Sequence, residues 1–441
     1  YDGVDQDCDG ANDYDQDGDG YESDAHGGTD CDDLVATTNP MAPELADGVD
    51  NNCADGADED FALYEIADNV ALLYGQPLGI TTNAYNDAFM VYHDGNGAIY
   101  YRKRNADGTW EAENTVPAAT GFSGEFLQAK VDGADNLQLA YTSFYSSTDM
   151  YFNFMETLGP NAGTWSNDIY VSQIFNGSTF DNGFRIGFDI DSSNRPSFVF
   201  YDQDTDVPKM VRTSSSLSNT LSSLTGTEML LDNFVQTGCT LCYAGTYASM
   251  AIDSSDRAHA VFYNYSDVNW AGDLFTDDAY ENQYAYVNSG SSSAQCTDGN
   301  WVSDFNDTYV DEDSGGIHNS VAIHPADDTP CVAYRDSDGD LLYACKDDGG
   351  CDQGWAVETV DSSGGDKDYA ALAFNSNSEP YIAYYNSTNG DLRIAHKANG
   401  TWDVQTIDNY GNVGNFAAID IDSSDMVHVI YYDVTNDVVK Y

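Results

Sequence analysis

The stretch DSSDMVHVIYY, Asp422–Tyr432, is one copy of a unit that recurs along most of this chain. It opens with a short polar turn and continues as a strand that ends in aromatic residues. The sequence numbers of its first and last residues differ by ten. The same offset occurs in DSSNRPSFVFY (Asp191–Tyr201), DSSDRAHAVFY (Asp253–Tyr263), HPADDTPCVAY (His324–Tyr334) and NSNSEPYIAYY (Asn375–Tyr385). Two looser copies end at Tyr92 and Tyr141. Seven copies with closing tyrosines 47 to 71 residues apart have the period of propeller blades.

Each unit continues with further strand signals. A second turn and another strand follow, as in Leu341–Cys345 and Leu392–His396. Five units then reach a tryptophan, at Trp110, Trp165, Trp301, Trp355 and Trp402. Four short strands with alternating patterning make one blade. The sequence therefore predicts an all-β fold with a seven-bladed β-propeller over residues 61–441; a two-sheet sandwich is the alternative, and the seven in-register copies count against it.

The two ends of this domain complement each other. The seventh copy stops at Tyr441, after its third strand. Phe61–Asp68 (FALYEIAD) matches the outer-strand pattern of Trp402–Asp408 (WDVQTID). We expect this N-terminal strand to supply the missing outer strand and close the ring, which would leave no open sheet edge.

Residues 1–60 form a different, loop-rich segment. DGVDQDC at residues 2–8 returns as DGVDNNC at residues 47–53, so the chain is expected to open inside a repeat of a longer protein. Between the copies, Asp15-x-Asp17-x-Asp19-Gly20 places carboxylates at alternate positions before a glycine, which is the pattern of a Ca²⁺ loop. Asp13-x-Asp15-x-Asp17-Gly18 is a competing frame, and a second loop starts at Asp5. The predicted calcium ligands are Asp5, Asp7, Asp9, Asp13, Asp15, Asp17, Asp19, Tyr21 through its carbonyl, Asp24, Asp30 and Asp32.

The nine cysteines are dispersed among strand and turn signals, which favours disulfides over zinc thiolates. If each Asp/Cys repeat pairs its own two cysteines, Cys31 joins Cys53 and the partner of Cys8 lies upstream of residue 1. Cys239-x-x-Cys242 has a redox-like or zinc-like spacing, but no second such pair and no helical context accompany it, so we expect a local disulfide. Cys345 has two candidate partners, Cys331 across a predicted hairpin and Cys351 beyond the next turn, and the sequence leaves both open.

The net charge of the chain limits the classes of partner that it can bind. Seventy-five acidic and fifteen basic residues give a formal net charge of -60, which repels nucleic acid and anionic lipid. No apolar run is long enough to span a membrane. An extracellular or cell-surface location, in a fluid rich in divalent cations, suits this composition, and a high-salt environment is the alternative.

Residues 1–60 resemble the Asp/Cys-rich metal-binding repeats of bacterial and archaeal surface proteins and, more distantly, thrombospondin type 3 repeats. The matching residues are Asp15, Asp17, Asp19, Gly20, Asp30, Cys31, Asp32, Asp33, Asn39, Pro40, Glu44, Asp47, Gly48, Asp50 and Cys53. Asn52 and Ala54 depart from the pattern, where aspartate is usual. The resemblance implies aspartates that line calcium and cysteines that staple the loops. Residues 61–441 resemble secreted bacterial seven-bladed propellers with Tyr-rich hairpins, an architecture that implies no particular active site.

No catalytic motif is present: the chain has no G-x-S-x-G, no H-E-x-x-H and no phosphate loop. We therefore expect a non-enzymatic surface or filament module, whose calcium-rigidified stalk presents a propeller for adhesion to a protein or glycan, for ligand binding or for assembly with neighbouring subunits. The alternative is a secreted glycosidase-like hydrolase with paired carboxylates at the channel mouth.

Three propeller features have ordinary structural interpretations beside functional ones. Asp336-Ser-Asp338-Gly-Asp340 could hold a cation, but it falls where other units have plain turns. The recurring DSSD turns suit side-chain-capped hairpins better than metal ligands. His259 and His428 occupy equivalent strand positions, and we expect them to be hydrogen-bonded packing residues.

Overall fold

The structure is a computed structural model. It describes residues 14–36, 38–41, 52–53, 64–67, 77–117, 122–144, 148–156, 163–166, 169–175, 185–202, 207–213, 226–230, 242–266, 279–289, 317–346 and 355–441. In these ranges the only helical element is the short 3-10 turn η1 (Asp24–His26). None of them contains a helix that could cross a membrane.

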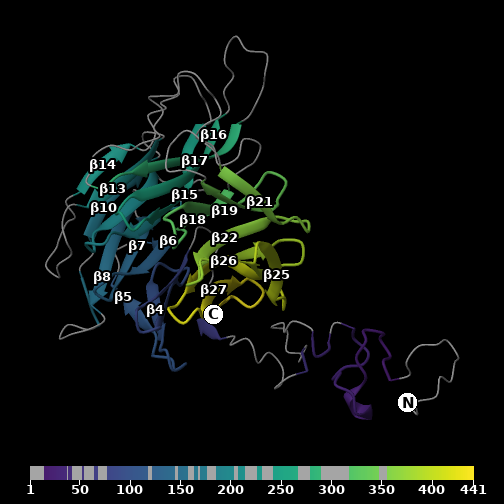
Figure 1. Cartoon of the computed structure of the whole chain (residues 1–441). Coiled ribbons are helices and arrows are strands. Elements are labelled where there is room, and N and C mark those ends of the chain that lie inside the picture. The colour runs from purple at the N-terminus through teal and green to yellow at the C-terminus, as the bar shows by residue number, and fades with distance from the viewer. Residues whose placement is uncertain are drawn as a thin grey trace, which may run out of the picture.

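Seven antiparallel sheets follow one another around a ring (Figure 1). Blade 1 contains β2 (Leu78–Thr82), β3 (Ala88–His93), β4 (Ile99–Arg104) and β5 (Asn114–Val116). Blade 2 contains β6 (Phe122–Val131), β7 (Asn136–Phe144), β8 (Thr148–Glu156) and β10 (Ile169–Phe175), with β9 (Thr164–Trp165) beside β8. Blade 3 contains β11 (Gly187–Ile190), β12 (Pro196–Asp202), β13 (Val207–Thr213) and β14 (Gly226–Leu230).

The remaining blades repeat this plan. Blade 4 has three described strands, β15 (Cys242–Ile252), β16 (Ala258–Ser266) and β17 (Ala279–Val287). Blade 5 contains β18 (Ile317–Ile323), β19 (Pro330–Arg335), β20 (Leu341–Lys346) and β21 (Trp355–Asp361). Blade 6 contains β22 (Lys367–Phe374), β23 (Pro380–Asn386), β24 (Asp391–Ala398) and β25 (Thr401–Asp408). The predicted seven-bladed, all-β propeller is confirmed, whereas the predicted boundary at residues 60 and 61 lies outside the described residues.

Blade 7 combines the two ends of the domain. It contains β26 (Val413–Ile421), β27 (Val427–Asp433), β28 (Val438–Lys440) and β1 (Glu65–Ala67). β1 pairs antiparallel with β28, with Glu65 opposite Lys440. Tyr64 and Tyr441 exchange two backbone hydrogen bonds of 2.9 Å beside this pair. The described part of the predicted strand Phe61–Asp68 is therefore the outer neighbour of the last strand.

The polar turns of the repeat cap themselves and also link blades. In blade 4, Asp253 Oδ1 accepts the backbone N–H groups of Ser255 (2.9 Å) and Arg257 (2.8 Å). Three residues after Asp253, Asp256 has a positive φ of 59° and accepts the N–H (2.8 Å) and hydroxyl (3.0 Å) of Ser192 in blade 3. The turn residue three positions after the first has a positive φ in six blades, and in blade 5 the residue four after His324 does; they are Asn86, Asp135, Asn194, Asp256, Asp328, Ser378 and Asp425. The prediction that these turns are capped hairpins is confirmed.

The tryptophans have an inter-blade role. Each described one that follows a third strand meets the edge of a tyrosine on the preceding blade; the pairs are Trp165 with Tyr101, Trp355 with Tyr284, Trp402 with Tyr343 and Trp110 with Tyr441, at centroid distances of 5.5, 5.4, 5.2 and 5.4 Å. Edge-to-face pairs of this kind add about 0.5–1.5 kcal/mol each to the burial of apolar area. The repeat therefore fixes how neighbouring blades pack.

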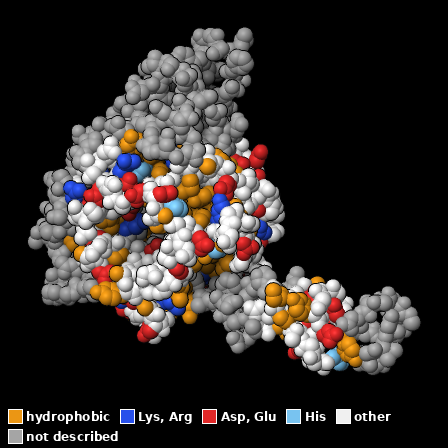
Figure 2. Space-filling view, in the orientation of Figure 1, with side chains coloured by type: hydrophobic (Ala, Val, Ile, Leu, Met, Phe, Trp, Pro, Cys, Tyr) orange, Lys and Arg blue, Asp and Glu red, His pale blue; other side chains and the backbone are white. Residues whose placement is uncertain are grey.

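Acidic side chains are scattered over the visible face and not gathered in one patch (Figure 2).

Candidate functional site

The loop that begins at Asp15 folds around its own first carboxylate. Asp15 Oδ1 accepts the N–H of Gly18 (2.8 Å), and its Oδ2 accepts that of Gly20 (3.0 Å). Both glycines have positive φ, 80° and 100°, a conformation that costs other residues energy. The alternating pattern of the sequence is thereby converted into a tight turn, and carboxylate oxygens of Asp15, Asp17 and Asp19 all lie within 4.8 Å of one another.

Two of the carboxylates in this segment have an oxygen with no hydrogen-bond partner among the described residues. These oxygens are Oδ2 of Asp17 and Oδ2 of Asp30, and both are buried. Burial raises the pKa of both groups, and the charges of Asp19 and Asp33 add to the effect on each. A buried anionic oxygen that faces other anions and no donor is unfavourable unless a cation lies between them. The residues present therefore fit a metal ion.

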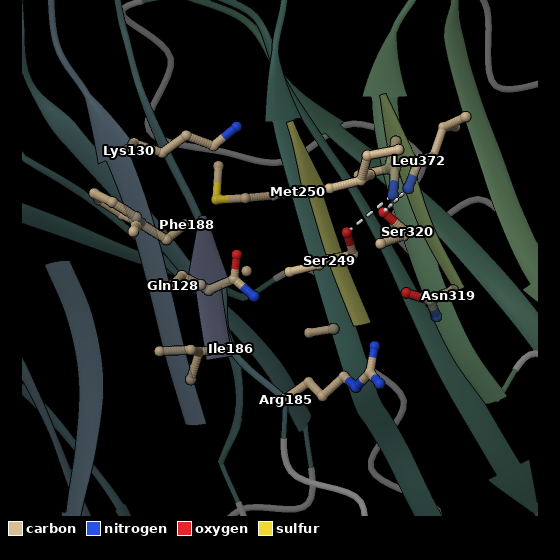
Figure 3. A pocket seen from close by; sticks show the side chains of 18 of the residues that line it. Gln128, Lys130, Arg185, Ile186, Phe188, Ser249, Met250, Asn319, Ser320 and Leu372 are labelled. Atoms are coloured by element: carbon tan, nitrogen blue, oxygen red, sulfur yellow. Dashed lines mark hydrogen bonds between the residues drawn. The ribbon is translucent and has the colours of Figure 1, made fainter. Parts of the chain in front are cut away.

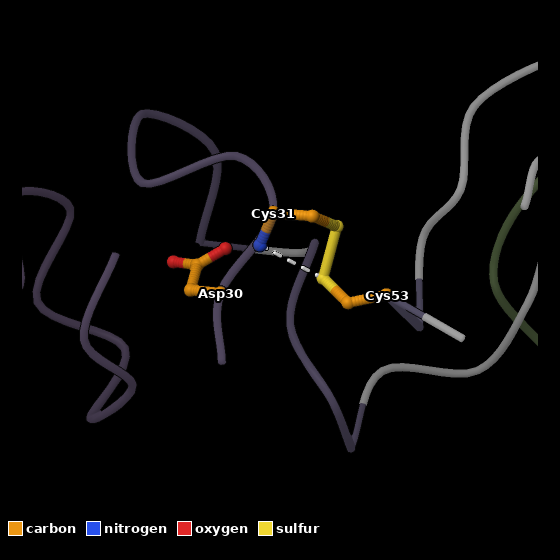
Figure 4. Close-up of side chains that lie close together, drawn as sticks. All are labelled: Asp30, Cys31 and Cys53. Carbon is orange, nitrogen blue, oxygen red and sulfur yellow. Dashed lines mark hydrogen bonds between the residues drawn. A yellow bond between two sulfur atoms is a disulfide. The ribbon is translucent and has the colours of Figure 1, made fainter. Parts of the chain in front are cut away.

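A disulfide fixes the return of the chain to this cluster. Cys31 and Cys53 are bonded, with Cα atoms 5.4 Å apart, as the sequence predicts. The N–H of Cys31 also approaches Sγ of Cys53 at 3.0 Å, beside the carboxylate of Asp30 (Figure 4). Because both sulfurs are in the disulfide, neither is a thiolate that could bind metal. Asp30 is thus the group of this trio that could act as a ligand.

The channel of the propeller is lined by the innermost strand of each blade. It encloses a cavity of about 110 Å³ (Figure 3). Small residues let the strands approach: a Cβ on Gly187 would lie 2.8 Å from the backbone nitrogen of Met250 on the next blade. Lys130 and Arg185 are the charged residues that line the cavity within the described part of the chain.

Two carboxylates lie near the Lys130 end of the channel, and both are used as links between blades. Asp189 Oδ2 accepts the N–H of Ile252 at 2.7 Å. Asp420 Oδ2 accepts the N–H of Thr82 at 2.6 Å and its hydroxyl at 3.0 Å. The ammonium of Lys130 is 3.9 Å from Asp189, and Asp420 also raises the pKa of Lys130. Both carboxylates therefore link neighbouring blades, and burial raises the pKa of Asp420.

Residues 2–14 and 30–59 match the family model Cu-binding_MopE, which is described as "Putative metal-binding motif". The N-terminal segment carries this motif. The match leaves out residues 15–29, so the loop of Asp15, Asp17 and Asp19 falls between its two parts. The name of the model mentions copper, and the match does not establish which metal this chain binds.

Solved structures share the propeller fold at low sequence identity. An ulvan lyase of polysaccharide lyase family PL25 is 10% identical, with a TM-score of 0.58 over 86% of this chain and 95% of the lyase. The same enzyme bound to -[GlcA(1-4)Rha3S]- gives a TM-score of 0.57 over the same shares. At this identity the likeness shows the fold alone. No curated protein sequence matches the chain.

The structure brings some of the predicted metal ligands together and leaves others apart. Asp15, Asp17 and Asp19 converge, and Asp30 is buried near them. Asp24 and Asp32 are exposed and are not in either described cluster, so their role stays a prediction. The N–H of Tyr21 donates to Asp19 Oδ1 (2.9 Å), which leaves the predicted role of the Tyr21 carbonyl open. Asp5, Asp7, Asp9 and Asp13 lie outside the described residues.

Asp33 is absent from the predicted ligands although it is as buried as a core residue, at 7% exposure. Its Oδ1 accepts the N–H of Gln16 at 2.9 Å, which ties it to the Asp15 loop. Its charge also contributes to the raised pKa of Asp17 and of Asp30. The Asp30-Cys31-Asp32-Asp33 run contained the signal, but spacing alone could not tell which carboxylate points inward.

The cysteine alternatives in the propeller are partly resolved. Cys331 and Cys345 are directly opposite each other on β19 and β20 and form a disulfide, with Cα atoms 4.1 Å apart. The alternative Cys345–Cys351 is therefore wrong, because Cys345 has its partner across the hairpin. Cys351 and Cys239 lie outside the described residues, so the pairing of Cys239 with Cys242 stays a prediction.

The other propeller candidates make hydrogen bonds within the fold. Asp336 Oδ1 accepts the N–H groups of Asp338 (2.9 Å) and Asp340 (2.8 Å), which is turn chemistry. His259 connects Tyr284 (2.7 Å from Nδ1) to the turn residue Asp253 (3.1 Å from Nε2). His428 makes the same bridge between Tyr441 and Asp422. The prediction of hydrogen-bonded packing histidines is confirmed.

Proposed function

We propose that this chain is a non-enzymatic extracellular surface or filament module, in which Ca²⁺ rigidifies residues 1–60 as the stalk of the propeller. The observation that carries the proposal is the convergence of carboxylates around Asp15, Asp17 and Asp19, with buried unpartnered oxygens on Asp17 and Asp30. Bound calcium would neutralise these groups and fix the path of the loop.

The donor set favours calcium over copper. The clustered side-chain donors among the described residues are carboxylate oxygens, which suit hard cations. Copper prefers imidazole and sulfur ligands, and the sulfurs beside Asp30 are locked in a disulfide. Calcium takes six to eight oxygens in flexible geometry, so carbonyls and water would complete the shell.

The same features support an extracellular location, which is part of the proposal. Disulfides at Cys31–Cys53 and Cys331–Cys345 persist in oxidising surroundings. A chain with a net charge of -60 also needs cations to reduce self-repulsion, and extracellular fluid supplies them. The partner would be a protein or glycan on a surface, or a neighbouring subunit, reached by the exposed propeller loops, since loops on a rigid scaffold commonly carry binding residues.

A second candidate is a secreted propeller enzyme that acts on a polysaccharide. The fold shared with the ulvan lyase favours it. The engagement of Asp189 and Asp420 in inter-blade hydrogen bonds speaks against a glycosidase pair at that end of the channel. Incubation with a panel of acidic and neutral polysaccharides, followed by assays for reducing ends and for unsaturated sugars, separates the two: new chain ends would support the enzyme.

The calcium proposal is tested by titration of the chelator-treated whole chain with Ca²⁺, Mg²⁺ and Cu²⁺ in a calorimeter. Ca²⁺ should bind, and limited proteolysis should show residues 14–41 protected by it. Asp17→Asn should weaken binding on the order of 10-fold or more, because it removes the negative charge of one ligand.

The matched control is Asp338→Asn, which changes an aspartate in the similar Asp-x-Asp-Gly run of the propeller turn. It should leave calcium binding unchanged. Tight Cu²⁺ binding with no response to Ca²⁺, or equal effects of the two substitutions, would contradict the proposal.

A further inference from the structure

One position recurs at the start of each inner strand, six residues before the first residue of the polar turn. Counting back from Asn83, Asp132, Asp191, Asp253, His324, Asn375 and Asp422 gives Pro77, Phe126, Arg185, Tyr247, His318, Tyr369 and Phe416. Five of the seven are rings of Phe, Tyr or His, and the third is arginine. Arg185 therefore occupies, in blade 3, a place that its neighbours fill with rings.

Four successive rings of this set form an arc. Their centroids are separated by 5.1 Å (Tyr247 to His318), 4.5 Å (His318 to Tyr369) and 4.8 Å (Tyr369 to Phe416). All four residues have positive φ, from 52° to 60°, at irregular points of the inner-strand pairing. This conformation costs about 1–2 kcal/mol per residue, and such strain is concentrated at functional sites.

Arg185 lies against this arc with part of its guanidinium unused. Its Cζ is 5.9 Å from the ring centroids of both Tyr247 and Tyr369. The residue is 5% exposed, and its Nη2 has no hydrogen-bond partner in the part of the chain that the structure describes. Burial lowers the pKa of Arg185 to about 10, so the side chain is still charged at neutral pH. A buried charged donor without an acceptor is unfavourable and indicates that a partner belongs there.

Asp368, the carboxylate whose charge acts on Arg185, is already hydrogen-bonded to other residues. Asp368 Oδ1 accepts hydrogen bonds from Arg335 (2.7 Å) and from His318 Nδ1 (2.9 Å). Burial lowers the pKa of His318 to about 4, so this ring is neutral and its Nδ1 proton faces Asp368. Arg335 therefore neutralises much of the charge of Asp368, and no ion pair of Arg185 is found among the described residues.

The cavity that Arg185 enters is lined by basic residues, although the chain as a whole is strongly acidic. Figure 3 places Arg185 at one end and Lys130 at the other, with Gln128, Ser249 and Asn319 between them. Its lining within the described residues contains both of these cations and no Asp or Glu, in a chain with 75 acidic residues. About 110 Å³ holds a small group only.

We propose that Arg185 binds the carboxylate of a small acidic ligand, or of one acidic unit of a larger ligand. The ligand would enter the propeller channel at the arc of Tyr247, His318, Tyr369 and Phe416. A planar carboxylate matches the fork of a guanidinium, and aromatic faces suit the C–H surface of a sugar ring. The proposal deepens the ligand-binding role given to the propeller above, and it requires no metal in the N-terminal segment.

The test is calorimetric titration of the whole chain with D-glucuronate, acetate and D-glucose, with and without chelator. Glucuronate should bind in both conditions and glucose should not. Acetate binding as tightly as glucuronate would support recognition of the carboxylate without help from the rings. Binding of glucose as tight as that of glucuronate, or no binding of either acid, would overturn the proposal. Because calcium is titrated separately, the failure of one proposal leaves the other intact.

Variants locate the site. Arg185→Gln should weaken glucuronate binding on the order of 10- to 100-fold, as expected for loss of a charge-assisted hydrogen bond. Lys130→Gln removes the cation at the other end of the same cavity, which is engaged with Asp189, and should change affinity less than threefold. If Arg185→Gln does not fold, a crystal of the wild-type protein soaked in glucuronate decides: density for the sugar on Arg185 supports the proposal, and density elsewhere or none overturns it.

Discussion

Two aspartates of the N-terminal loop, Asp17 and Asp30, and the propeller-turn aspartate Asp253 have opposite surroundings. In the turns, Asp253 accepts two backbone N–H groups and a histidine hydrogen bond, and these interactions lower its pKa although burial would raise it. In the N-terminal loop, Asp17 and Asp30 face other carboxylates, and their pKa values are raised. A carboxylate that accepts several hydrogen bonds stabilises the fold by itself. A carboxylate surrounded by other carboxylates is stabilised by a bound cation.

The largest expected contrast comes from removing one aspartate in each region. Asp253→Ala leaves the N–H groups of Ser255 and Arg257 and the ring of His259 without their acceptor, which should cost about 2–4 kcal/mol. The propeller's melting temperature should fall by several degrees, equally with calcium and with chelator. Asp15→Ala should leave that temperature unchanged and remove only the calcium-dependent protection of residues 14–41. A calcium-dependent loss of stability in Asp253→Ala would break the comparison.

A smaller contrast lies inside the N-terminal segment, between two adjacent aspartates. Asp33 is buried and its charge acts on Asp17 and Asp30, whereas Asp32 is exposed and accepts the N–H of Leu34 at 3.3 Å. Asp33→Asn should weaken calcium binding about tenfold, and Asp32→Asn by less than twofold, in the same calorimetric titration. The reverse order would mean that the metal binds on the other side of the loop.

The smallest contrast is in the response to acid, measured with chelator present. A raised pKa means that the folded loop binds protons more readily than the unfolded chain, so its stability should rise as pH falls from 7 towards 5. A lowered pKa, as at Asp253 and Asp361, gives stability that is present above about pH 4 and is lost below it. Hydrogen exchange, corrected for the intrinsic rate, should show residues 14–36 better protected at pH 5 than at pH 7.

The same experiment has an internal check. With calcium present, protons compete with the metal for the same oxygens, so the loop should become less protected as pH falls. If protection of the loop changed with pH in the same direction with calcium and with chelator, these carboxylates would not hold the ion.

The propeller could be predicted because the sequence patterns that specify its turns and strands are local and repeated. The DSSD turn caps itself within five residues, and the alternating strands after it pair with their immediate neighbours. The Cys31–Cys53 bond could be predicted from the repeat as well. The choice between Cys331 and Cys351 as partner of Cys345 could not, since it depends on which residues lie opposite each other in the hairpin.

The arc around Arg185 was present in the sequence as a fixed offset of six residues, yet nothing in the spacing distinguishes a core aromatic residue from one at a channel mouth. The distinction comes from the irregular pairing at Tyr247, His318 and Tyr369, which turns each residue to positive φ.

The sequence by itself determined the number of blades, the turns between their strands and the alternating aspartates of the N-terminal loop, because each depends on residues within a few positions of one another. Only the tertiary structure decided which carboxylates accept hydrogen bonds and which crowd together. It also decided that, among the described residues, Nη2 of Arg185 has no partner and the lining of the cavity contains no Asp or Glu. These properties depend on burial and on neighbours from distant strands, and the electrostatic energy of a charged group is set by those neighbours and not by its position in the chain.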